Sequence, residues 1–187
     1  MEDGIDTIVL DDELAYIDVV PLCWTALAEA AEPDRVSAQC EQNLRLLQAL
    51  AALEDHGPTD KADENSPHSA DLMRVEFKVN LLLDLVGQIL VRGAPRPAAV
   101  PMRFNARSAT WRTEDRALVA GAYGRLEIWL REALVEPLRM YGRVVSVGID
   151  RRVKLRFDAL GAPVEDLIEK LAFQRHRRHV AGTRERR

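Results

Sequence analysis

The sequence predicts an α+β protein in which antiparallel strands are interrupted by a helical segment and followed by a C-terminal helix. Residues 99–157 alternate apolar and polar side chains in several runs, which is the period of a half-buried strand. Residues 33–54 and 69–92 instead carry apolar side chains at helical spacing, and so does the segment that begins at Pro163. Together with an extended segment over residues 7–24, the strands lie on both sides of a helical insertion.

The first element, over residues 7–24, is predicted to be extended. An apolar run of Ile8, Val9 and Leu10 is followed by Ile17 and Val19 with polar neighbours, and then by Pro21. The acidic run 11–13 is expected to form an exposed turn.

A first helix is predicted from Pro33 to about Glu54, because proline suits the first helical turn. Its apolar residues recur at helical spacing: Val36, Cys40, Leu44, Leu47 and Leu50. The polar stretch 55–69 has no apolar anchor, and we expect it to be a mobile loop.

The second helix, over residues 69–92, carries three unbroken heptads of aliphatic residues. Its 24 residues exceed the average helix of about 11–12 residues and span roughly 36 Å. Further apolar side chains lie outside the heptad positions, so the helix is either buried in one domain or central in a larger bundle. Two observations favour self-association. The helix is long, and the neighbouring β segment is too small to cover it on all sides. The predicted seam consists of Leu72, Val75, Val79, Leu82, Val86 and Ile89.

The strand-forming segment and the last helix have distinct charge patterns. Apolar residues alternate with arginines around residues 102–107, 125–131 and 152–157, so the outward face is rich in Arg. The helix that begins at Pro163 has acidic residues in its first turn, which favours the helix dipole, and basic residues near its end.

Charge is distributed unevenly along the chain. Residues 1–34 hold ten carboxylates and no Lys or Arg, whereas residues 151–187 hold eleven Lys or Arg against five Asp or Glu. This polarity indicates contact between the two ends or contact with a partner. The formal net charge of −4 argues against non-specific nucleic-acid binding.

Several functional classes find no support in the residues. Cys23 and Cys40 lack metal or redox spacing, which fits a reducing cytoplasm. His176 and His179 have metal-compatible spacing but no accompanying carboxylate or thiol, so no metal site is predicted. The acidic N-terminus is unlike a signal peptide, and no apolar run reaches the roughly 18 residues of a membrane span. Phosphate-binding and hydrolase motifs are missing, and we predict a non-enzymatic protein.

The strand segments and the C-terminal helix together resemble a known family. In order, VPMRFNARSATW, GRLEIWL, LRMYGRVVSV, RVKLRFDAL and FQRHRR resemble a PilZ domain. More narrowly, the chain resembles the atypical, tetramer-forming PilZ group, in which helices interrupt the barrel after its first strand. The resemblance covers residues 99–180 well and residues 7–24 loosely.

This resemblance implies a six-stranded antiparallel β-barrel interrupted by a two-helix insertion that forms a coiled coil, plus a C-terminal helix. The expected division is 1–24 for the start of the barrel, 25–93 for the oligomerisation insertion, 94–162 for the rest of the barrel and 163–187 for the helix and basic tail.

Many PilZ domains bind cyclic di-GMP through RxxxR in an N-terminal loop and [DN]xSxxG on a following strand. Here the first Arg of the chain is Arg35, so the first motif is missing. At the second, Asn105 fits, but Arg107 stands in place of Ser and Thr110 in place of Gly. Arg103 and Arg107 do spell RxxxR, and on one strand they would share a face with Asn105. The resemblance therefore implies direct binding that is weak or absent, with Arg103, Asn105 and Arg107 as the candidate ligand site and no other cofactor.

Three functions remain open at this point. The first is an oligomeric adaptor in cyclic di-GMP signalling, with a protein partner, possible links to pilus machinery, and motility or virulence as outputs. The second is a direct cyclic di-GMP receptor, and the third is a structural scaffold. The heptad residues do not choose between two, three and four strands; the surplus apolar faces and the resemblance favour a parallel homotetramer.

Overall fold

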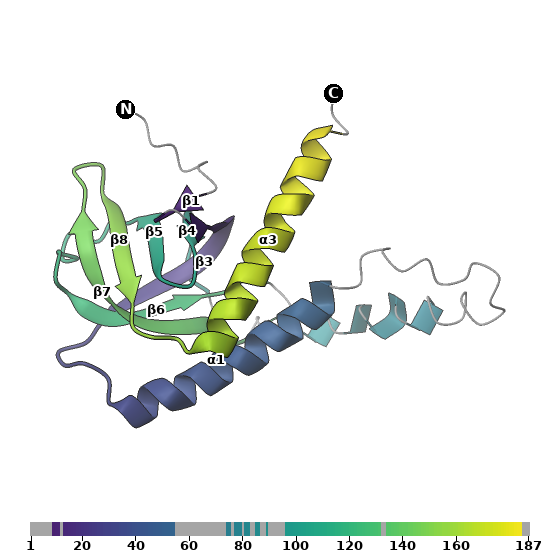
Figure 1. Cartoon of the computed structure of the whole chain (residues 1–187), viewed down its shortest axis with the longest axis horizontal. Helices are drawn as coiled ribbons and strands as arrows, with labels where there is room; N and C mark the ends of the chain where they lie inside the picture. Colours follow the sequence, from purple (N-terminus) through teal and green to yellow (C-terminus); the bar gives the residue numbers. More distant parts are fainter. Residues whose placement is uncertain are drawn as a thin grey trace.

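A computed structural model of the chain describes residues 9–11, 13–54, 74–75, 77–79, 81–82, 85–86, 89, 96–131 and 134–184. In these ranges the elements follow one another along the chain (Figure 1). They are β1 (Val9–Leu10), β2 (Glu13–Leu14), β3 (Tyr16–Ala26), α1 (Pro33–Glu54), β4 (Ala99–Phe104), β5 (Ser108–Arg112), β6 (Tyr123–Ile128), β7 (Leu138–Val147), β8 (Arg152–Phe157) and α3 (Ala162–Arg184).

Strands β3 to β8 form a closed antiparallel barrel in the order β3-β4-β5-β8-β7-β6. The long strand β3 closes it, because residues 16–21 pair with β4 whereas residues 22–26 pair with β6. The predicted six-stranded antiparallel barrel, split after its first strand by a helical segment, is therefore confirmed. The short strands β1 and β2 pair only with each other and form a hairpin outside the barrel sheet.

Two glycines allow the barrel to curve tightly. Gly124 of β6 lies opposite Gly142 of β7. A Cβ added at Gly124 would lie 2.3 Å from the carbonyl oxygen of Thr25, and one added at Gly142 would lie 2.3 Å from that of Arg156. Only glycine permits this close approach of the neighbouring backbones.

Both helices bury one face against the barrel. Leu47 and Leu50 of α1 and Ile168 of α3 join the core that fills the barrel. Buried Asn43 of α1 fixes this docking through its amide, which donates to the carbonyl oxygen of Arg139 at 2.6 Å and accepts from the same residue's N–H at 3.1 Å. Helix α1, expected as part of the insertion, thus packs on β7 and α3.

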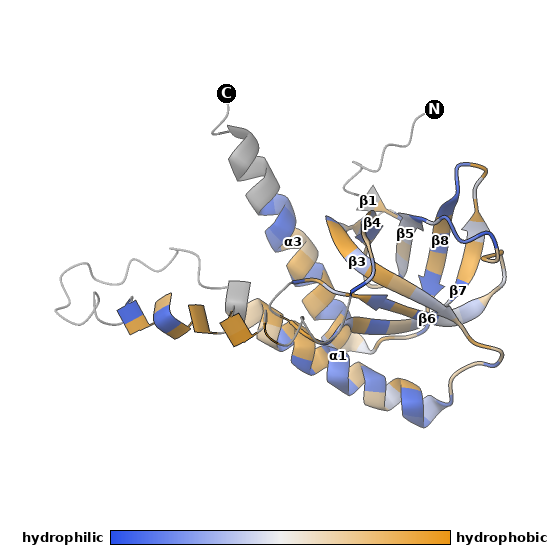
Figure 2. Cartoon of the chain, turned by 180° about the vertical axis from the view of Figure 1, so that it is seen from behind, coloured by the Kyte–Doolittle hydropathy of each residue, from blue (hydrophilic) through white to orange (hydrophobic). Residues whose placement is uncertain are grey.

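The second predicted helix is described only in part. Residues 74–75, 77–79, 81–82, 85–86 and 89 are helical, and they lie beyond the end of α1, away from the barrel (Figure 1). Apolar side chains along them are exposed, from 46% at Leu85 to 68% at Phe77. The five described seam residues are among these exposed side chains, and Figure 2 shows the apolar colour on these pieces. Leu72 lies outside the described residues, as does loop 55–69.

A helix that could cross a bilayer would need both length and high hydropathy, and none of the helices among the described residues has both.

Candidate functional site

The outer surface of three adjacent strands is strongly basic. The register places Arg103 of β4 beside Thr110 of β5, and Thr110 beside Lys154 of β8. In the flanking pairs of β5 and β8, Arg112 lies opposite Arg152 and Ser108 opposite Arg156. We call this surface the basic face, and it consists of Arg103, Arg112, Arg152, Lys154 and Arg156.

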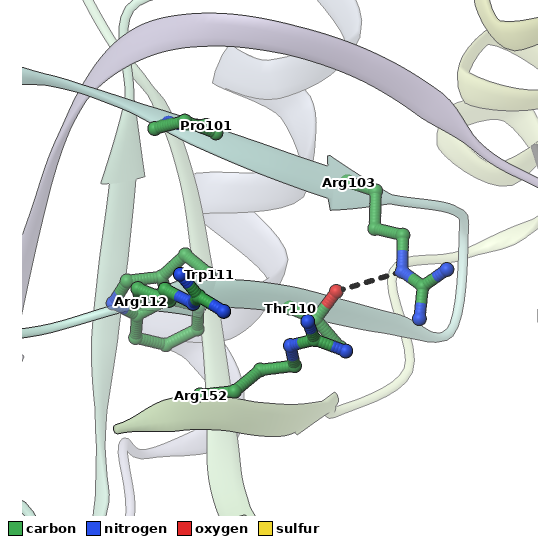
Figure 3. Close-up of a pocket in the computed structure, with 6 residues that line it drawn as sticks. All are labelled: Pro101, Arg103, Thr110, Trp111, Arg112 and Arg152. Atoms are coloured by element: carbon green, nitrogen blue, oxygen red, sulfur yellow. Dashed lines mark hydrogen bonds between the residues drawn. The ribbon is translucent and has the colours of Figure 1, made fainter. Parts of the chain in front are cut away.

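A shallow hollow lies on the basic face, with three of its arginines around it (Figure 3). The Nε of Arg103 donates to Oγ1 of Thr110 at 3.0 Å. The Oδ2 atom of Asp150 lies 3.5 Å from Nη2 of Arg112 and 3.7 Å from Nε of Arg152. The residues lining the hollow are Pro101, Arg103, Thr110, Trp111, Arg112 and Arg152.

These contacts give the hollow its electrostatic character. The backbone N–H of Arg152, which donates to Asp150 at 3.2 Å, holds the pKa of that carboxyl below its ordinary value, and the guanidinium groups of Arg152 and Arg112 act in the same direction. Guanidinium groups bind carboxylate and phosphate oxygens through paired hydrogen bonds. The hollow is therefore chemically suited to anions.

Asn105 belongs to the turn between β4 and β5, and its side chain is hydrogen-bonded there through both its oxygen and its nitrogen. It is 1% exposed. Its Oδ1 accepts from the backbone N–H groups of Arg107 and Ser108, each at 2.9 Å, which is the arrangement of an Asx turn. Its Nδ2 donates to the carbonyl oxygen of Leu10 at 2.7 Å. Asn105 thus shapes the turn and holds the N-terminal hairpin against it.

Acidic residues of that hairpin lie against the same turn. Asp11 accepts a hydrogen bond from Oγ of Ser108 at 2.7 Å and pairs with the ammonium group of Lys154. Glu13 pairs with Nε of Arg107 at 2.9 Å. Burial would raise the pKa of Asp11, but the hydrogen bonds from Lys154 and Ser108 outweigh it and leave this pKa below its ordinary value. Asp11 is therefore ionised near neutral pH.

The structure separates the three predicted ligand residues. Arg103 lies on β4, which ends at Phe104, whereas Asn105 and Arg107 belong to the turn. The expectation that the three share one strand face is wrong, because Asn105 turns inward to satisfy backbone groups while Arg107 is exposed. Their role in ligand binding stays a prediction.

Sequence reasoning missed the other members of the site. Ser108 and Lys154 donate to Asp11, which was expected only as part of an exposed turn. The uneven charge of the chain was the available signal. Asp11 with Lys154, and Asp18 with Arg175 at 2.5 Å, each join the acidic N-terminal part to the basic C-terminal part.

A metal site in the described part of the chain would need several side chains that could bind the ion together. There, no three His, Cys, Asp or Glu side chains gather in a way that could hold an ion. The Nδ1 atom of His176 on α3 is buried, and no described residue makes a hydrogen bond with it.

Comparisons with known proteins agree with the barrel. The family described as "Atypical PilZ domain, cyclic di-GMP receptor" matches residues 47–186. A solved protein from Xanthomonas campestris superimposes with a TM-score of 0.67 at 21% identity, and the match covers 94% of this chain and 95% of that one. That protein is described as pathogenic and as a new tetrameric PilZ domain self-assembled via an unusual helical bundle. A comparison with curated proteins found no match.

Proposed function

This chain belongs to the atypical PilZ domain family, and we propose that it is a non-enzymatic signalling protein that acts as an oligomeric adaptor in cyclic di-GMP pathways. In this proposal it binds the nucleotide weakly or not at all and transmits the signal through a protein partner in the cytoplasm. The observation that carries the proposal is the state of Asn105, whose amide is bonded to Leu10, Arg107 and Ser108 of its own chain.

The neighbouring positions support weak direct binding. Thr110 stands where the motif of cyclic di-GMP-binding PilZ domains has glycine, and its hydroxyl accepts from Arg103 on the outer face. A side chain here occupies space that glycine would leave to a ligand. Arg107, which replaces the motif's serine, is paired with Glu13. The groups best placed to contact a nucleotide are therefore already engaged within the chain.

A second candidate is a direct cyclic di-GMP receptor that uses Arg103, Arg107 and the basic face. The observation in its favour is the hollow bordered by Arg103, Arg112 and Arg152, which suits phosphate oxygens. Arg107 also remains accessible, since its side chain is 74% exposed despite the ion pair.

We also propose that the helix over residues 69–92 assembles the chain into a parallel tetramer through a coiled coil. Its described seam residues are exposed in the single chain, and contiguous apolar surface of this kind marks interaction sites. The similar Xanthomonas protein is described as tetrameric through a helical bundle. The barrel would then be carried outside a central bundle, available to partners such as pilus or motility proteins.

Titration calorimetry of the purified chain with cyclic di-GMP at moderate salt tests the adaptor proposal. We expect no measurable heat at high nucleotide concentration from protein whose folding is confirmed by circular dichroism. Micromolar or tighter binding that is lost in Arg107→Ala would contradict the adaptor proposal and establish the receptor.

A further inference from the structure

The acidic hairpin, of which residues 9–11 and 13–14 are described, places negative charge over part of the barrel surface. Its buried anchor is Leu10, which is 4% exposed and whose carbonyl oxygen accepts from Asn105. Asp11 is hydrogen-bonded to Ser108 and paired with Lys154, and Glu13 is paired with Arg107. Two carboxylates of the hairpin thus occupy the hydrogen-bond donors at this end of the basic face.

The donors under the hairpin form an anion site. The guanidinium group of Arg107 comes from the β4–β5 turn, the hydroxyl of Ser108 from the start of β5 and the ammonium group of Lys154 from the middle of β8. Such donors bind phosphate and carboxylate oxygens alike, through charge-assisted hydrogen bonds. In the closed barrel, Ser108 and Lys154 lie on strands that are directly paired, so the site does not depend on the hairpin for its shape.

The hairpin itself is a marginal element. Each of its strands has two residues, and among the described strands it forms a separate two-stranded sheet outside the barrel. An isolated two-stranded hairpin has little stability of its own. Asp11 has a φ of 53°, in the left-handed region that residues other than glycine seldom adopt. In the ion pair of Glu13 and Arg107 the guanidinium group is 74% exposed, so solvent screens the pair from that side and weakens it.

We infer that the acidic hairpin is an internal competitor that occupies the anion site of Arg107, Ser108 and Lys154, and that a cyclic dinucleotide phosphate reaches this site only when the hairpin leaves. This inference rests on the proposed function and gives a cause for weak direct binding. The apparent affinity for the nucleotide equals the affinity of the open site multiplied by the fraction of chains in which the site is open, so a small open fraction gives weak binding. A partner that takes up the hairpin would then increase nucleotide binding.

Neutral isosteres of the two carboxylates test the inference. In Asp11→Asn/Glu13→Gln the side chains keep their size but lose the charges that hold the hairpin on the site, so the hairpin should leave more readily. We expect titration calorimetry with cyclic di-GMP to show binding at least about tenfold tighter than wild type. Adding Arg107→Ala to that variant should remove most of the gain, which localises the binding to the turn. Melting curves establish that each variant is folded.

The matched control removes the same charge elsewhere. Glu41 and Glu136 are exposed, and their ion pairs are with Arg45 on α1 and with Arg139 on β7. Glu41→Gln/Glu136→Gln should leave the affinity within about twofold of wild type, because it changes the net charge but not the hairpin. An equal gain in the control would overturn the inference, since net charge alone would then explain it.

The remaining outcomes separate the two proposals. If neither wild type nor Asp11→Asn/Glu13→Gln binds the nucleotide, the inference is wrong and the adaptor proposal stands. If wild type already binds at micromolar concentration, the adaptor proposal fails. The inference is then decided by whether the hairpin variant binds more tightly still, and equal affinities would overturn it.

Discussion

Two buried asparagines join segments that are far apart in the sequence. Asn43 bonds α1 to the backbone of Arg139, and Asn105 bonds the β4–β5 turn to Leu10. A buried amide must be hydrogen-bonded to be tolerated, and these two use both their donor and their acceptor. Asn105 is thus unsuitable for testing ligand binding, because its loss would disturb the turn itself. Arg107, which is exposed, is the informative position.

The environment of another single residue, Tyr123, leads us to expect that the folded protein loses stability at alkaline pH. Burial, and then the hydrogen bond that its hydroxyl donates to Asp158 at 2.6 Å, raise the pKa of Tyr123 to about 12. A raised pKa means that the neutral phenol is favoured in the folded state. Its contribution is complete below the unfolded pKa of about 10 and is lost as the pH rises toward 12.

Urea unfolding between about pH 9 and pH 12 measures this effect. The free energy of unfolding of wild type should fall more than that of Tyr123→Phe, by roughly 1 kcal/mol. We expect less than the full shift would give, because the phenol is partly exposed and solvent screens it. Parallel pH dependence in the two proteins would contradict the assignment.

At the scale of the element, the predicted seam can be tested without harming the barrel. Leu82 is 60% exposed in the single chain, so Leu82→Asp leaves its core intact. In a tetramer the same change would bury a carboxylate in apolar surroundings, at a cost of roughly several kcal/mol per chain. Light scattering should therefore report a smaller species than wild type.

The control places the same new side chain on another face of the same helix. Arg74 is exposed and lies outside the heptad seam, so Arg74→Asp should leave the mass unchanged. A Leu82→Asp protein with the mass of wild type would rule out the seam as the interface.

For the whole molecule, we expect assembly of the chains into a tetramer to increase their thermal stability. When folded chains associate and unfolded ones do not, the melting temperature rises with protein concentration. For a tetramer of this chain length we expect the melting temperature to rise by roughly 2–4 °C for each tenfold increase in concentration, and by less in Leu82→Asp. Differential scanning calorimetry over two decades of concentration measures this. A wild-type melting temperature independent of concentration would contradict the coupling.

Local patterns in the sequence were enough to predict several elements. The helical spacing of apolar residues after Pro33 predicts α1 with its observed ends, and the strict alternation in β6 and β8 marks them as strands with one buried face. Such patterns succeed because each of these elements meets the core along a single face. The six-stranded antiparallel barrel came from the resemblance, and the topology confirms it, whereas the order of its strands comes from the structure.

The tertiary structure alone decided the features that depend on distant contacts. Residues 108–111 of β5 are all buried, so no alternation reveals this strand. Asn105 lies within a run that alternates like a strand, yet its partner Leu10 is 95 positions away and turns it inward. Asp11 and Lys154 are separated by 143 positions and meet only because the barrel closes. Periodicity reports which face of an element is buried, whereas the fold decides which residues that face meets.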